Sequence, residues 1–106
     1  MHPSPGTDPN PQFVTSRVTV LRAAILLKQS YVALCLDNPT GAFGYATQLL
    51  DLGGGVPAGH RVLGRLYAGE ALILLDRISE AVAYLDPHKV SNTIYEVTKL
   101  TVQYVL

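Results

Sequence analysis

The chain has 106 residues, of which 48% are hydrophobic and 15% are charged, and its eight Lys and Arg residues balance eight Asp and Glu residues. This length suits one small domain or part of a larger one, and the low charge content indicates that some apolar surface awaits a partner. The balanced charge, without a basic stripe, disfavours direct binding to nucleic acid. A single cysteine, Cys35, without His or Cys at metal-ligand spacing favours a reducing compartment, so we expect a cytoplasmic and nuclear protein.

Residues 1–13 are rich in proline and lack the basic start and apolar run of a signal peptide. We expect them to form a disordered tail. The longest apolar stretches are interrupted by charged residues such as Arg22 and Lys28, so they fall short of the ~18 uncharged apolar residues that a membrane span requires. We therefore expect no membrane-spanning segment.

The first predicted helix runs from about Val14 to Leu36. Its apolar residues recur at three- and four-residue steps, which gathers them on one face: Val18, Leu21, Ile25, Leu26, Val32 and Leu36. Asn38 followed by Pro39 is typical of a helix N-terminus and predicts a second helix over 39–52. The glycines at 53–55, with Pro57 behind them, end that helix in a loop.

A third helix is predicted from about Gly59, with a wide apolar face made of Val62, Leu63, Leu66, Leu72, Ile73 and Leu75. Asp37 and Asp76 hold the same place at two inter-helix turns, where caps are expected, and Asp76 is expected to cap a fourth helix. Asp86 before Pro87 ends the fourth helix. Residues 91–106 mix helical spacing with β-branched residues, and we expect a further helix there.

Residues 30–42 and 69–81 resemble each other at an offset of 39 residues. Small residues at matching places let paired helices approach closely, and we assign repeat packing to Ser30, Ala42, Gly69 and Ala81. A tetratricopeptide unit has a period of about 34 residues, and the glycine-rich connection accounts for the difference. The prediction is therefore an all-α chain with two tetratricopeptide-like helical hairpins at 14–90, an excerpt of an α-solenoid.

Three runs support a family resemblance: YVALCLDN at 31–38, AFGYATQLL at 42–50 and LGRLYAGEALILLDRISEAVAYLDP at 63–87. Together they resemble the tetratricopeptide-repeat family of subunit ten of the eukaryotic Ccr–Not deadenylase complex, over about residues 18–90. The resemblance implies a non-catalytic scaffold in mRNA poly(A) shortening, mRNA decay and translational repression. It implies docking to a sister subunit and to the large central scaffold. Family members are several times longer, and the residues after Val90 do not visibly follow the family.

No catalytic or metal-binding pattern is visible. The three histidines lack the spacing of a zinc site, and the glycines at 53–55 lack the lysine and Ser/Thr of a phosphate loop. Cys35 lies between leucines and is expected to be a buried, structural thiol. We therefore expect no enzyme, no metal and no cofactor.

Other interpretations remain open at this point. A generic tetratricopeptide peptide-binding or co-chaperone-like module is the alternative, although such clamps need several Lys, Arg and Asn residues and this chain offers few. Arg61 and Arg65 form an i, i+4 pair that is most simply a solvated face but could contact an acidic partner. The tyrosines at 31, 67 and 84 are expected to pack between helices rather than to stack on bases.

Overall fold

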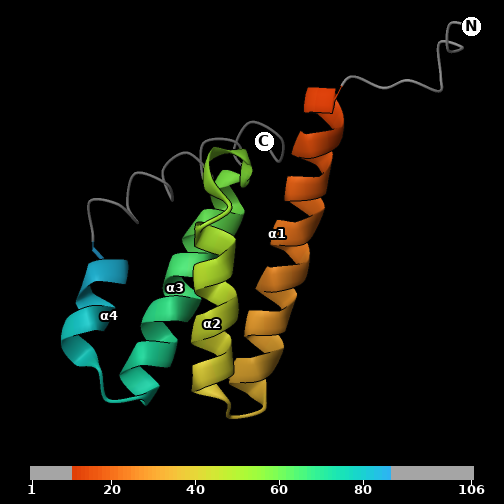
Figure 1. Cartoon of the computed structure of the whole chain (residues 1–106). Helices are drawn as coiled ribbons and strands as arrows, with labels where there is room; N and C mark the ends of the chain where they lie inside the picture. The colour runs from red at the N-terminus through yellow and green to blue at the C-terminus, as the bar shows by residue number, and fades with distance from the viewer. Residues whose placement is uncertain (1–10, 87–106) are drawn as a thin grey trace, which may run out of the picture.

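The computed structural model describes residues 11–86, which form four α-helices and one short 3-10 helix, with no strand among them (Figure 1). The helices are α1 (Pro11–Cys35), α2 (Pro39–Leu50), η1 (Gly53–Gly55), α3 (Ala58–Leu74) and α4 (Ile78–Tyr84). The predicted all-helical class is confirmed. Helix α1 begins at Pro11 rather than at the expected Val14, in line with the preference of proline for the first helical turn. The predictions for residues 1–10 and 91–106 lie outside the described residues.

The helices form two antiparallel hairpins, α1–α2 and α3–α4 (Figure 1). Helix α3 packs against both helices of the first hairpin, and α4 packs on α3. Both hairpin turns lie at one end of the molecule, and the glycine-rich connection through η1 lies at the other (Figure 1). Gly53 has a φ of 85° in that connection, a conformation in which glycine avoids the steric cost of a side chain.

The two hairpin turns have the same backbone geometry. Asp37 and Asp76, which are 39 positions apart (76 − 37), have φ angles of 57° and 59°. In both turns the next N–H group reaches back to the last turn of the preceding helix, from Asn38 to the Ala33 carbonyl and from Arg77 to the Leu72 carbonyl, each at 2.8 Å. This is the Schellman arrangement, which satisfies carbonyl groups at a helix C-terminus.

The turns correct one prediction and confirm another. The expectation that Asp76 caps α4 is wrong, because Asp76 closes α3 in the left-handed conformation and Arg77 is the N-cap of α4, without a side-chain cap. Asp37 likewise closes α1. Asn38 does cap α2, since its Oδ1 accepts a hydrogen bond of 3.1 Å from the Gly41 N–H. Aspartate tolerates the left-handed conformation better than most residues, which suits it to this place.

The core between the helices is built largely from small side chains. One cluster joins α1, α2 and the residue after η1, and it contains Ala23, Leu26, Leu49 and Val56. A second cluster joins α1, α2 and α3, and it contains Ala33, Ala42 and Ala71. Alanines at the contact let helix axes approach closely, so the helices pack tightly although few large side chains are fully buried.

The apolar face predicted on the first helix exists, but most of it faces outward. Val18, Ile25 and Val32 are 51%, 59% and 50% exposed, and Leu21 and Leu36 are exposed as well. Leu26 is the buried member of the predicted face, and Ala23, Ser30 and Ala33 join it on the side of α1 that faces its neighbours. Regular apolar spacing therefore identified one face of α1 without showing whether that face is buried or exposed.

This outward face has a consequence for the membrane prediction. Within the described residues, Ser16–Cys35 is one segment long and apolar enough to cross a membrane by length and composition alone. A single segment of this kind is weak evidence, and α1 contains Arg22 and Lys28 and packs along α2 and α3. The absence of a membrane span stays a prediction.

Candidate protein-docking surface

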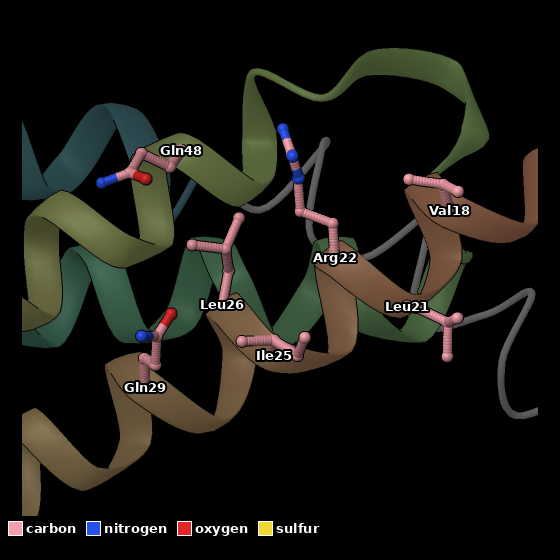
Figure 2. Close-up of a pocket in the computed structure, with 7 residues that line it drawn as sticks. All are labelled: Val18, Leu21, Arg22, Ile25, Leu26, Gln29 and Gln48. Atoms are coloured by element: carbon pink, nitrogen blue, oxygen red, sulfur yellow. The ribbon is translucent and has the colours of Figure 1, made fainter. Parts of the chain in front are cut away.

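A long apolar groove runs along α1 beside α2. Its first part, with a volume of about 410 Å³, is lined by Val18, Leu21, Arg22, Ile25, Leu26, Gln29 and Gln48 (Figure 2). Its second part, of about 320 Å³, is lined by Lys28, Gln29, Val32, Ala33, Leu36, Asn38 and Tyr45. Gln29 belongs to both parts, so the two form one continuous surface, which we call the α1–α2 groove.

Figure 2 shows how the first part of the groove is formed. Arg22 and Leu26 point from α1 toward the side on which α2 runs, whereas Leu21 points away from it. Gln48 is the contribution of α2. The floor is aliphatic and polar groups stand at its margin, which is the usual composition of a surface that binds another protein.

The second hairpin also exposes apolar side chains. On α3 and α4 the large hydrophobic residues that remain exposed are Leu63, Leu66, Ile73, Leu74, Ile78 and Val82. The module therefore presents apolar residues on both its first and its last helices. Repeats that stack in an array bury such faces against their neighbours, and a segment taken alone leaves them open.

The structure places Arg61 and Arg65 in different roles. The Arg65 Nε donates to the Tyr84 carbonyl at 3.2 Å, and its Nη2 donates to the Ala83 carbonyl at 3.0 Å. The Arg65 guanidinium also lies 5.8 Å from the centre of the Tyr84 ring. Arg65 therefore binds α3 to the end of α4, where helix carbonyls need donors. Arg61 is exposed, so contact of this pair with an acidic partner stays a prediction.

All four residues assigned to repeat packing are buried. The Ser30 Oγ donates a 2.8 Å hydrogen bond to the Ala42 carbonyl, which joins α1 to α2. At the matching place in the second hairpin, a Cβ on Gly69 would lie 2.5 Å from the Leu85 Cγ. The two hairpins therefore use different contacts at equivalent positions, a difference that sequence spacing does not reveal.

Aromatic pairs join helices that are distant in sequence. The rings of Tyr31 on α1 and Tyr67 on α3 lie 6.1 Å apart, and Phe43 on α2 makes an edge-to-face contact at 5.8 Å with Tyr84 on α4. Such pairs contribute about 0.5–1.5 kcal/mol beyond the area that they bury. All three tyrosines singled out in the sequence thus take part in contacts between helices.

The prediction for Cys35 is wrong, because its thiol is free and exposed. Consecutive helical residues point about 100° apart, so the leucines beside Cys35 in sequence do not surround it in space. A side-chain hydrogen bond with Cys35 raises the pKa of Tyr31 above its usual value of 10.0. Between residues 11 and 86, no three His, Cys, Asp or Glu side chains gather as metal ligands would.

Antiparallel helix pairs in which α3 packs on both helices of the preceding pair define a segment of a tetratricopeptide-type helical solenoid. The model of the CNOT10 tetratricopeptide repeat domain family matches residues 20–103. The chain belongs to this family. The match continues past Val90, so the expectation that the residues after Val90 depart from the family is wrong.

Curated relatives agree with this membership. The chain is 44% identical over 75 residues to CCR4-NOT transcription complex subunit 10 of Danio rerio, an alignment that covers 68% of this chain. It is 38% identical over 93 residues to subunit 10-A of Xenopus laevis and 36% identical over 88 residues to subunit 10 of Drosophila melanogaster, with 85% and 81% of this chain covered. The chain spans only 11%, 12% and 14% of these three relatives.

Proposed function

We propose that this chain is a non-catalytic scaffold segment of subunit ten of the CCR4-NOT complex. Through protein–protein contacts it would support poly(A) shortening, mRNA decay and translational repression in cytoplasm and nucleus. Family membership and the names of the relatives support this proposal. The observation that carries it is the α1–α2 groove, a largely aliphatic surface that remains open beside the packed core between the helices.

The groove also favours an adaptor over a peptide clamp. A clamp that reads a terminal carboxylate needs several cationic and amide side chains turned toward one peptide. Of the seven residues that line the first part of the groove, four are aliphatic and only Arg22 is cationic. Such a surface suits the apolar face of another helix, which is how subunits of a helical scaffold hold one another.

Affinity purification of the tagged chain from eukaryotic cells tests the proposal. We expect subunits of the CCR4-NOT complex to be recovered, above all a sister subunit and the central scaffold. Recovery of chaperones and degradation factors alone would contradict the adaptor function. A nuclease assay on adenylated RNA is the matching control, and we expect the purified chain to show no cleavage.

A further inference from the structure

We propose that the α1–α2 groove binds an amphipathic helix of a partner protein whose apolar stripe is flanked by acidic residues. This inference rests on the proposed adaptor function and names the chemistry of the partner. It follows from three features of the groove: its spacing, its shape and its charge.

The spacing of the groove matches a helix. Val18, Ile25 and Val32 follow one another at seven-residue steps along α1, and all three line the groove. Apolar residues at this period lie along one seam, which is the pattern by which two helices pack side by side. From Val18 to Leu36 the seam is about 27 Å long, at 1.5 Å per residue. A partner helix of about 20 residues would cover it.

The shape favours a helix over a flat surface. The groove is a hollow between two helices, with Tyr45 and Gln48 of α2 on one side and α1 on the other. Figure 2 shows α3 running behind α1 and α2, with Ile25 and Gln48 in front. The hairpin thus holds α3 on one side, with a Cβ on Gly64 only 3.0 Å from the Leu49 Cδ2, and offers a second concave side.

The charge along α1 favours an acidic partner. The charged residues of α1 are Arg17, Arg22 and Lys28, and neither α1 nor α2 contains an acidic residue. Arg22 and Lys28 line the groove, and Arg17 lines the adjacent hollow with Leu21. Arg77 and Glu80 form a salt bridge at the start of α4, and among the described residues none joins Arg17, Arg22 or Lys28 to a carboxylate. Two cations at the groove and a third beside it complement carboxylates at the margins of an apolar stripe.

Fluorescence anisotropy with the full chain tests the inference. The probe is a labelled helical peptide of about 20 residues with leucines at coiled-coil spacing and glutamates on both flanks. A matched peptide carries lysines in place of the glutamates. We expect the acidic peptide to bind at least ~10-fold more tightly than the basic one, a ratio that corresponds to about 1.4 kcal/mol. We also expect binding to weaken as salt is added. Equal binding of the two peptides would overturn the inference.

Two kinds of variant locate the site. Ile25→Glu changes an exposed side chain in the groove, and Val82→Glu makes the same kind of change at an exposed position on α4. We expect Ile25→Glu to abolish binding of the acidic peptide and Val82→Glu to leave it unchanged. Arg22→Glu combined with Lys28→Glu should reverse the preference between the two peptides. A peptide preference that survives both groove variants would show that the site lies elsewhere.

The same variants separate this inference from the proposed function. If Ile25→Glu recovers CCR4-NOT subunits as well as the unchanged chain does, the groove is not the docking surface although the adaptor function stands. If the acidic peptide binds at the groove but no complex subunits are recovered, the adaptor function fails and the groove chemistry stands. A dimer that Ile25→Glu dissociates, or binding to phosphatidylserine vesicles without binding to the peptide, would replace the partner helix with a different occupant and overturn the inference.

Discussion

The backbone of Gly69 lies so close to Leu85 that a Cβ atom at position 69 would stand 2.5 Å from the Leu85 Cγ. At the offset of 39 residues, the counterparts in the first hairpin are Ser30 (69 − 39) and Ala46 (85 − 39). At these two positions the first hairpin has a serine and an alanine, and the second hairpin has a glycine and a leucine. The two hairpins share a backbone plan but distribute side-chain volume differently across it.

Gly69→Ala should destabilise the chain. The methyl group would overlap the Leu85 side chain at its branch point, and overpacking of this kind costs about 1–3 kcal/mol. Alanine also brings a gain of about 1 kcal/mol to a helix interior, and the 2.5 Å approach to the Leu85 Cγ places the cost in the upper part of its range, above that gain. Urea unfolding followed by circular dichroism measures the free energy of unfolding.

The double variant Gly69→Ser with Leu85→Ala tests the explanation. It reproduces the residue types of the first hairpin. We expect its loss of unfolding free energy to be smaller than the sum of the losses of the two single variants, by about 0.5–3 kcal/mol. Additive effects would show that Gly69 is required for a reason other than the Leu85 side chain.

Ser30→Ala should lower the free energy of unfolding by about 0.5–1.5 kcal/mol, because it removes the buried hydrogen bond to the Ala42 carbonyl. Thermal and urea unfolding of the variant give this difference. Ser79→Ala on α4 is a matched control, since Ser79 is exposed, and it should change stability by less than about 0.5 kcal/mol. Equal effects of the two changes would argue against a stabilising role for the Ser30 hydrogen bond.

At the two turn positions, glycine should stabilise the chain and a branched side chain should destabilise it. Asp37 has a φ of 57°, and a side chain in the left-handed conformation costs about 1–2 kcal/mol. We expect Asp37→Gly to raise the melting temperature and Asp37→Val to lower it. The same pair of changes at Asp76, where φ is 59°, should give effects of the same sign. Opposite signs at the two positions would contradict the equivalence of the turns.

The Arg77–Glu80 pair should give a small pH dependence of stability on the acid side. The hydrogen bond from Arg77 lowers the pKa of Glu80 below its usual 4.5, and both side chains are largely exposed. A carboxyl group whose pKa is lowered by folding stabilises the fold above its unfolded pKa, and this contribution disappears as pH falls through the folded pKa. Urea midpoints of the unchanged chain should therefore fall more than those of Glu80→Gln as pH drops below about 4.5. Parallel pH profiles would show that the pair contributes nothing.

Much of the architecture follows from local signals. Sequence alone predicted the start of α2 at Asn38–Pro39 and the repeat of 39 residues. Helix caps and internal repeats have short, regular sequence patterns that can be recognised without a structure. The inward and outward faces of α1 were not distinguishable. Val18, Ile25 and Val32 have the spacing of a core face, yet alanines at the contact bring the neighbouring helices close to the other side of α1.

The long-range contacts could not be predicted at all. Arg65 reaches the Tyr84 carbonyl across 19 residues of sequence, and the packing of α4 on α3 brings the two together. The groove has the same origin. Its apolar residues are local to α1, but its second side is formed by Tyr45 and Gln48 of α2.

The matching turns at Asp37 and Asp76 also indicate where the length of the array can vary. Each hairpin turn is fixed by the same set of backbone hydrogen bonds, so an inserted residue there would break the geometry of a whole helix pair. The glycine-rich connection at the opposite end lacks this turn geometry (Figure 1), and it is held instead by Val56, which is buried in the core. Insertions between repeats would alter the twist of the superhelix while each hairpin stayed intact. We therefore expect the curvature of the helical array to vary with the length of the connections between repeats.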